Sequence, residues 1–351
     1  MLSSLPIVQA PMAGAQDTEL CIAVCKAGGL GSLPCAMLSP ADARAEIAAV
    51  RAQTDAPFNV NFFTHRPPAV DAQREALWLA QLGAYYAEAG IDPAAIGAPP
   101  TRAPFDDAMC VMIEEMRPAV VSFHFGLPDE ALVARVRATG AKILSTATTV
   151  AEARWLAARG VDGVVAQGRE AGGHRGMFLS EDIEAQPGLF ALLPQIVDAV
   201  DIPVIAAGGI ADGRGVAAAL ALGAVAAQIG TAFLFTPQAR ISPAHRAALA
   251  GARDDGTRLT NLYTGRPARG IETRFMREMG PMNAKAPEFP RATLASAPLR
   301  AAFEAKGRDD FSPLWAGEAA VLGRSEDAGA TTLRLWREAQ ARLRALAAAS
   351  G

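Results

Sequence analysis

The sequence is poor in the features that mark several specialised classes of protein. Its net charge is only −3 over 351 residues, and Lys and Arg are spread along the chain, so nucleic-acid binding is not expected. The longest apolar run, residues 216–235, contains Gln228 and two glycines, which makes it a poor membrane span. The amino terminus has neither a basic region nor a cleavage site, so we expect no secretory signal.

Cysteine is also scarce. Cys21 and Cys25 lie four residues apart on a predicted helix, and Cys35 and Cys110 are isolated, so the chain has neither a CxxC pair nor a zinc framework. Cys21 and Cys25 could supply half of a metal site, but no cluster of His or Cys completes it. We expect all four cysteines to behave as small, buried hydrophobic residues, in a cytoplasmic protein that binds no metal.

Aliphatic residues are what the chain has in quantity. Hydrophobic residues make up 51% of it and aromatic residues only 6%, which suits strands buried on both faces. Eight short apolar runs predict such strands: 6–9, 29–34, 58–63, 119–125, 141–147, 163–167, 203–209 and 225–231. Alanine-rich amphipathic segments separate most of them, for example 18–29, 129–140 and 149–160. This alternation predicts the α/β class and a (β/α)₈ TIM barrel.

Two stretches interrupt the alternation. Residues 64–118 separate the third and fourth strands and contain two proline-rich links, which predicts an insertion after strand three. After the eighth strand, residues 236–351 carry helical patches, a segment rich in Pro and Met, and a last helix at about 327–348. We therefore expect a barrel domain at 1–235 and a helical C-terminal extension at 236–351 that returns over the barrel mouth.

His174 stands in the most informative segment, GREAGGHRGMF at 168–178. The segment directly follows a predicted strand, and ligands of parallel α/β barrels gather at the carboxyl ends of their strands. A loop histidine can also merely cap a turn or face solvent. Arg175, next to it, has two interpretations: it attracts an anionic substrate, or it is exposed and forms a salt bridge within the loop. His65 and His245 are expected to face solvent.

Glycines end the last two predicted strands. Gly208-Gly209 ends the seventh strand and Gly230-Thr231 ends the eighth, where barrels commonly bind phosphate through backbone N–H groups. The alternative is that these glycines only form tight turns. Two such loops on consecutive strands favour the phosphate site.

Six segments, in this order, resemble the nitronate monooxygenase family, formerly called 2-nitropropane dioxygenases, whose members are FMN-containing TIM barrels. The segments are PIVQAPMAG (6–14), PFNVNFF (57–63), SFHFG (122–126), QGREAGGHRG (167–176), PVIAAGGIADGRG (203–215) and QIGTAFL (228–234). TGRPARG (264–270) extends the resemblance into the C-terminal region, where Tyr263 and Arg266 either cover the barrel mouth or pack beside it. One such segment alone would be a weak signal, but the ordered set is specific.

The resemblance implies roles for individual residues. The implied FMN contacts are Ala10, Pro11 and Met12 along the flavin ring, Asn61 and Gln167 as hydrogen-bonding partners, Gly172 and Gly173 as backbone contacts, and Gly208, Gly209, Gln228, Gly230 and Thr231 around the phosphate. Ser122 and His124 would line the substrate pocket. His174 would be the active-site base or hydrogen-bond donor, and the ordinary histidine pKa of about 6.5 suits proton transfer near neutral pH.

The implied activity is oxidation of nitronates with O₂ to carbonyl compounds and nitrite, without reduced nicotinamide. One alternative is an FMN-dependent NAD(P)H:quinone reductase or enoyl-acyl-carrier-protein reductase of the same superfamily, although the chain has no separate GxGxxG fingerprint. A second alternative is a flavin-binding barrel without catalysis. The expected partners are the small-molecule substrate and O₂, and a homodimer is the oligomer we expect.

Overall fold

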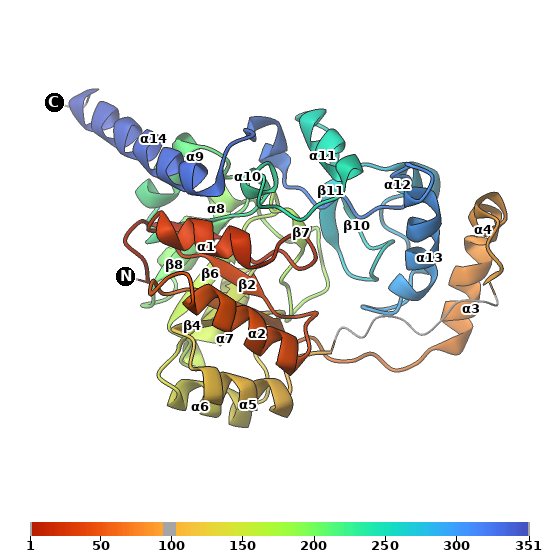
Figure 1. The fold of residues 1–351 in the computed structure, drawn as a ribbon, viewed down its shortest axis with the longest axis horizontal. Helices are drawn as coiled ribbons and strands as arrows, with labels where there is room; N and C mark the ends of the chain where they lie inside the picture. The colour runs from red at the N-terminus through yellow and green to blue at the C-terminus, as the bar shows by residue number, and fades with distance from the viewer. Residues whose placement is uncertain (1, 94–102, 350–351) are drawn as a thin grey trace.

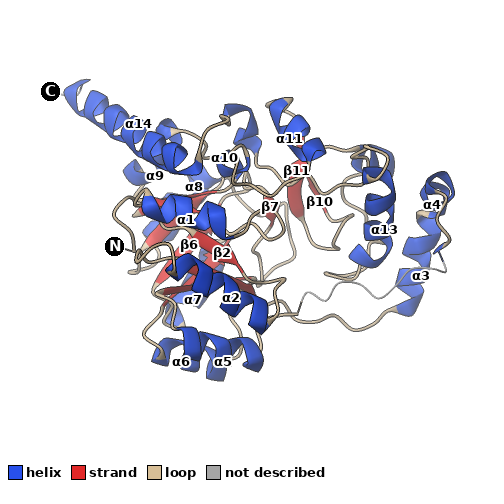
Figure 2. Ribbon diagram, in the orientation of Figure 1, coloured by secondary structure: helices blue, strands red, loops and turns tan. Residues whose placement is uncertain are grey.

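A barrel of eight parallel strands forms the centre of the protein (Figures 1 and 2). The computed structural model describes residues 2–93 and 103–349; residues 94–102 of the expected insertion, residue 1 and residues 350–351 lie outside the described residues. Around the barrel the strands follow the order β1 (Ile7–Gln9), β9 (Ala226–Ile229), β8 (Val204–Ala207), β6 (Gly163–Gln167), β5 (Lys142–Ala147), β4 (Val120–His124), β3 (Asn59–Phe63) and β2 (Ser32–Pro34).

Backbone hydrogen bonds also join the two ends of this strand order. Gln9 N donates to Leu30 O at 2.9 Å, and Leu30 N donates to Ile7 O at 2.9 Å. These bonds place β1 against the chain that leads into β2. All eight strands fall inside the predicted runs, so the predicted (β/α)₈ barrel is confirmed.

Helices form the outer ring of the barrel: α1 (Thr18–Lys26), α2 (Pro40–Arg51), α5 (Asp107–Met116), α6 (Glu130–Ala138), α7 (Val150–Ala158), α8 (Leu189–Val197), α9 (Gly213–Ala221) and α14 (Ala328–Ala349). Several begin at a side chain that accepts a backbone N–H of the first turn, as Asp17, Ser39 and Thr149 do for α1, α2 and α7. These caps explain why the helices begin where the strand-to-helix loops end.

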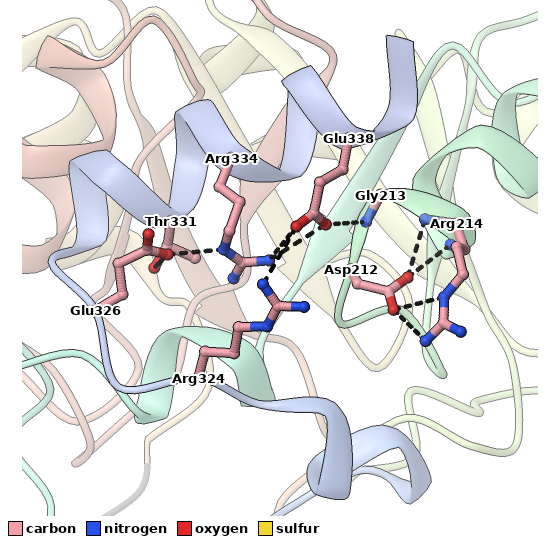
Figure 3. Close-up of polar contacts among 9 residues, drawn as sticks. Asp212, Gly213, Arg214, Arg324, Glu326, Thr331, Arg334 and Glu338 are labelled. Carbon is pink, nitrogen blue, oxygen red and sulfur yellow. Dashed lines mark hydrogen bonds and ion pairs between the residues drawn. The ribbon is translucent and has the colours of Figure 1, made fainter. Parts of the chain in front are cut away.

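Helix α14 completes the ring although it comes from the C-terminal region, because it packs against both α9 and α1. Figure 3 shows a polar contact at its junction with α9, where Glu338 Oε2 accepts from Gly213 N at 3.0 Å. It also shows Arg334 of α14 bound to Glu326, in the segment that leads into this helix, at 2.8 Å. A Cβ added at Gly213 would lie 2.2 Å from the Cβ of Glu338. The backbone of α14 therefore sits directly on the first turn of α9.

Side-chain alternation along β4 separates the hydrophobic core from the barrel interior. Val121 and Phe123 belong to the large apolar cluster shared with the surrounding helices. Val120 lies in a smaller cluster with apolar residues of other barrel strands, such as Leu144 and Val165. Ser122 and His124 follow Val120 on the same face, so this face becomes polar toward the carboxyl end of the strand.

The C-terminal region contains strands as well as helices. Its helices are α10 (Thr231–Leu234), α11 (Pro243–Ala250), α12 (Arg274–Met279), α13 (Thr293–Glu304) and the 3₁₀ helix η2 (Glu318–Leu322). Strands β10 (Thr257–Thr260) and β11 (Ala268–Ile271) pair in antiparallel fashion, and β11 also pairs with β7 (Gly173–His174). A sequence-based expectation of helices alone missed this small sheet, because β10 and β11 have only four residues each and the third strand, β7, is distant from them in the chain.

The insertion after β3 packs on this C-terminal region. Helices α3 (Ala72–Gln81) and α4 (Gly83–Ala89) lie beside α13 in Figure 1. Their aromatic side chains share a buried cluster with Phe275 and Phe303, and Arg274 binds Glu88 at 2.9 Å. Among the described residues, no helix is long and apolar enough to cross a membrane.

Candidate active site

A cavity of about 310 Å³ lies at the carboxyl ends of the barrel strands, within the range of roughly 300–1,000 Å³ that is usual for small-molecule sites. Every residue that the sequence predicted for flavin or substrate lines this cavity: Ala10, Pro11, Met12, Asn61, Ser122, His124, Gln167, Gly172, Gly173, His174, Gly208, Gly209, Gln228, Gly230 and Thr231. Residues 312–315 also line it. The C-terminal region thus returns over the barrel mouth.

His174 is held in a strand and not in a free loop. It pairs with Ala268 of β11, and Arg175 N donates to Pro267 O at 2.8 Å. Its ring Nε2 lies 2.9 Å from the Oγ1 of Thr264. The backbone and the ring of this histidine are therefore both positioned by the TGRPARG segment.

The carbonyl of His174 is fixed from the opposite side by two barrel residues. Gln167 Nε2 donates to it at 3.0 Å, and His124 Nε2 lies 3.1 Å from it. Because a carbonyl oxygen only accepts, Nε2 of His124 carries its proton, and its Nδ1 accepts from Thr146 Oγ1 at 3.0 Å. Gln167 Oε1 accepts in turn from Gly176 N at 2.8 Å.

His124 is a neutral hydrogen-bonding residue. Burial is the main cause that lowers the pKa of His124 to about 4; the positive charges of Arg266 and Arg175 act in the same direction, and the bond to the His174 carbonyl opposes them. Both ring nitrogens already have partners. His124 is therefore poorly suited to proton transfer.

Arg175 differs from both sequence-based interpretations, and both are wrong. Its side chain is 0% exposed, so it is neither a surface salt bridge nor a group that meets a substrate. The guanidinium donates to Gly168 O at 2.6 Å, Gln167 O at 2.9 Å and Gln186 Oε1 at 2.8 Å. Burial lowers the pKa of Arg175 to about 10, so the group stays charged at neutral pH and ties the loop to the end of β6.

Glu152 anchors the far end of the same loop. Its buried carboxylate accepts from Phe178 N at 2.6 Å, from Leu179 N at 3.1 Å, and from the amide and hydroxyl of Thr148 at 2.7 Å each. Together with Arg175, this carboxylate fixes the chain on both sides of Gly176 and hence the direction from which His174 enters the cavity.

The glycine loops form a cradle of close backbone approaches. Gly208 has a φ of +110°, and a Cβ there would lie 3.0 Å from Ala171 N. A Cβ at Gly172 would lie 2.6 Å from Gly317 N, whose N–H donates to Thr231 Oγ1 at 2.9 Å. Thr231 begins the single turn of α10, so the first N–H groups of that turn have no acceptor within the helix.

Asn61 and Ser122 form the polar floor of the cavity. Asn61 occupies the middle of β3, and its Nδ2 donates to Ser122 Oγ at 2.9 Å and to Ser122 O at 3.2 Å. The amide oxygen of Asn61 is thereby turned away from Ser122 and can accept from a ligand that lies on this floor.

Comparison with known proteins identifies the family. Residues 1–329 match the family model described as nitronate monooxygenase. The chain belongs to the nitronate monooxygenase family. It is 44% identical over 336 residues to the nitronate monooxygenase of Paraburkholderia phytofirmans, covering 95% of this chain and 92% of that protein. It is also 44% identical over 327 residues to the nitronate monooxygenase of Pseudomonas aeruginosa, covering 91% and 92%.

Solved structures agree with this membership of the nitronate monooxygenase family. Nitroalkane oxidase from Streptomyces ansochromogenes superposes with a TM-score of 0.90 at 42% identity, over 98% of each chain. FabK from Thermotoga maritima superposes with a TM-score of 0.74 at 27% identity, over 99% of this chain and 96% of that one. The barrel is thus shared with FabK, but the match to the nitroalkane enzyme is much closer.

Several residues of this nitronate monooxygenase family member were missed or misplaced by the sequence analysis. Thr264 was not singled out, although the resemblance at TGRPARG identified its segment. Trp315 and Phe289 pack their rings 5.5 and 5.3 Å from the ring of His174, yet no sequence signal marked them. His65 and His245, expected to face solvent, are only 5% and 7% exposed, because the C-terminal region covers them.

Proposed function

We propose that this protein oxidises nitronates with O₂ to carbonyl compounds and nitrite, with FMN as its cofactor. The observation that carries the proposal is the position of His174, whose imidazole lines the cavity at the carboxyl end of the barrel and is held there by Thr264. Membership of the nitronate monooxygenase family supports the substrate class. When bound, FMN would take electrons from the substrate and deliver them to oxygen.

The residues around the cavity fit an FMN. Gly208 and Gly209 both have positive φ, so their N–H groups can approach an anion without a Cβ in the way. These two glycines, Gly230 and Thr231 would bind the phosphate. Ala10, Pro11, Met12, Asn61, Gln167, Gly172, Gly173 and Gln228 would contact the remainder. The amide oxygen of Asn61 fits an N–H donor of the flavin ring, since its own NH₂ is used by Ser122.

His174 would act directly on the substrate. With a neutral nitroalkane, its imidazole would take the proton from the α-carbon, and the C–H electron pair would form the C=N bond of the nitronate. With a substrate that is already a nitronate, the protonated or neutral ring would donate a hydrogen bond. Ser122 and His124 would shape the pocket beside it, and His124 stays neutral because burial holds its pKa at about 4.

A second candidate function is an NAD(P)H-dependent flavin reductase. The superposition on FabK supports it, since that protein shares the barrel over 96% of its length. The higher identity to nitronate monooxygenases, 44% against 27%, favours the first function. A flavin-binding barrel without catalysis is the remaining alternative.

The test is oxygen consumption by the FMN-loaded protein with propionate 3-nitronate and no nicotinamide, with His174→Ala and the exposed-site control Arg337→Ala in parallel. We expect rapid oxygen uptake with nitrite release, lost in His174→Ala and kept in the control. Oxidation of NADH with a quinone, without nitronate turnover, would move the assignment to the reductase. Bound flavin without either activity would leave a binding protein.

The cellular setting is also a proposal. All four cysteines are buried free thiols, which agrees with a reducing, cytoplasmic location. A homodimer stays our prediction for the oligomer, and sedimentation of the purified protein at several concentrations tests it.

A further inference from the structure

We infer that Glu170 is a positioning residue, whose carboxylate holds the 168–173 loop after β6 against Gly208 and Gly209 and thereby sets how tightly the protein binds the phosphate of FMN. The inference rests on the proposed function for its cofactor. Glu170 is not among the described residues that line the cavity, so it acts on the phosphate through the backbone of its neighbours.

The carboxylate of Glu170 caps the amino terminus of α8. Both of its oxygens lie 2.9 Å from the backbone nitrogen of Leu189, the first residue of that helix. The residue before it, Gly188, provides no side-chain cap, although the first N–H groups of a helix lack acceptors inside it. A carboxylate suits this place, because the positive end of the helix dipole attracts an anion. The 168–173 loop is thus bound to α8 by a charge-assisted hydrogen bond.

Glycines leave the space that this carboxylate occupies. A Cβ added at Gly168 would collide with Glu170 Oε2, and one added at Gly188 would lie 2.8 Å from Oε1. Gly188 has an ordinary φ of −67°, so its backbone conformation does not require a glycine. The close approach of the Glu170 carboxylate explains why a residue without a side chain stands there.

The same loop packs directly on the glycines that are expected to bind the phosphate. A Cβ at Gly208 would lie 3.0 Å from Ala171 N and 3.2 Å from Gly168 O. A Cβ at Gly209 would lie 3.4 Å from the Cβ of Glu170. The two loops are therefore in contact, and a shift of the 168–173 loop would move the surface on which Gly208 and Gly209 rest.

Backbone bonds also hold this loop. Arg169 N donates to Pro187 O at 3.2 Å, and Glu318 N donates to Glu170 O at 3.0 Å. Both join neutral groups, whereas the bond from Leu189 N to the carboxylate is shorter and charge-assisted, and hence stronger. Loss of the carboxylate should therefore loosen the loop without unfolding it.

A loosened loop weakens the grip on a phosphate in particular. Backbone N–H groups bind an anion well when they are already oriented toward it, because ordering them during binding costs affinity. Residues expected at the flavin ring, such as Met12 and Asn61, lie on other segments, after β1 and in β3. Glu170 therefore contributes to the affinity for FMN and much less to the affinity for riboflavin, which has the same ring and ribityl chain but no phosphate.

The test compares the dissociation constants of FMN and riboflavin for the flavin-free protein, measured by the quenching of flavin fluorescence. We expect Glu170→Ala to weaken FMN binding by about 10-fold or more, the equivalent of one charge-assisted hydrogen bond, and riboflavin binding by less than about 2-fold. Glu170→Gln keeps an oxygen that accepts from Leu189 N and loses only the charge, so its FMN affinity should stay within about 5-fold of the wild type. Equal losses for both ligands, or no loss of FMN affinity in Glu170→Ala, would overturn the inference.

Two further variants separate the carboxylate bond from a general effect. Glu184→Ala removes another carboxylate bound to the same loop, at Arg169, but from an ion pair at 3.0 Å in which the Glu184 side chain is 77% exposed. We expect both dissociation constants to stay unchanged there. Gly188→Ala keeps Glu170 but places a methyl group 2.8 Å from Oε1, so it should displace the carboxylate and weaken FMN binding selectively. A selective loss in Glu184→Ala, or none in Gly188→Ala, contradicts the inference.

The outcomes also distinguish this inference from the proposed function. If the wild type binds FMN no more tightly than riboflavin, the predicted phosphate site is wrong, and the inference is wrong with it. If the wild type prefers FMN and Glu170→Ala prefers it equally, the proposed cofactor stands and only the inference is wrong. Should Glu170→Ala fail to fold, the same comparison in Gly188→Ala decides.

Discussion

Replacing Arg175 with leucine should loosen the loop that carries His174. Leucine fills part of the same volume but cannot donate, so three acceptors each lose one donor: Gln167 O, Gly168 O and Gln186 Oε1. Gly168 O keeps a second donor, Ala171 N at 3.1 Å. Most of the loss in the free energy of unfolding should therefore come from Gln167 O and Gln186 Oε1.

The magnitude follows from these contacts. Hydrogen bonds from a charged donor contribute about 1.5–3 kcal/mol each. The sum overstates the effect, because removing the guanidinium also removes its own desolvation cost. We expect Arg175→Leu to lower the free energy of unfolding by about 2–5 kcal/mol, because two buried acceptors are left unsatisfied at about 1–3 kcal/mol each. Arg175→Lys keeps the charge but not the planar fork, so a smaller loss of about 1–3 kcal/mol is expected.

Urea unfolding at a fixed excess of FMN measures these losses, since ligand binding then contributes in the same way to each protein. The exposed-site variant Arg337→Leu serves as control for the change in composition. Nitronate turnover should fall together with stability, because the loop positions His174. Arg175→Leu with a free energy of unfolding within about 0.5 kcal/mol of the wild type would refute the reasoning.

Three further predictions concern the cradle, the buried histidines and the outer ring. Gly208→Ala should lose bound flavin, which absorbance measures. Gly140→Ala should keep the flavin, because Gly140 has a similar positive φ of +88° but nothing lies within 4 Å of the added Cβ. Equal flavin content in the two variants would contradict a role for Gly208 in the cradle. The free energy of unfolding should decrease as the pH falls from about 6.5 to about 4, because histidines of the unfolded chain bind protons there while burial holds the pKa of His124 and of His245 at about 4. Each of the two histidines can contribute a loss of up to about 3 kcal/mol. A pH slope that is unchanged in His245→Asn would exclude a contribution of His245. Gly213→Ala should cost about 1–3 kcal/mol in urea unfolding by overpacking, since its Cβ would meet the backbone of α14; a stabilised variant would show that α14 can shift without cost.

Local sequence patterns were sufficient to predict the barrel. Each barrel strand is an apolar run bounded by turn residues, and the helix caps at Asp17, Ser39 and Thr149 are visible in the sequence. Residues at the carboxyl ends of such strands must meet, so the cavity lining around His174 could also be predicted. The roles of those residues toward flavin came from resemblance and stay predictions, as does the domain boundary at 235.

Long-range contacts account for what could not be predicted. Strand β7 is two residues long and pairs with β11 about ninety residues away, so no local periodicity marks it. Arg175 is bound by backbone carbonyls, and carbonyls have no sequence signature, which is why an arginine that looked exposed is buried. The burial of His245 likewise depends on the covering C-terminal region.

The position of α14 has a consequence for how the protein is made. The first helix of the outer ring, α1, touches the last, α14, so the ring stays open while the ribosome is still synthesising the C-terminal region. Until α14 emerges, the flanks of α1 and α9 that it covers are exposed apolar surface in the cell. The outer ring of helices can therefore be completed only after α14 has been synthesised.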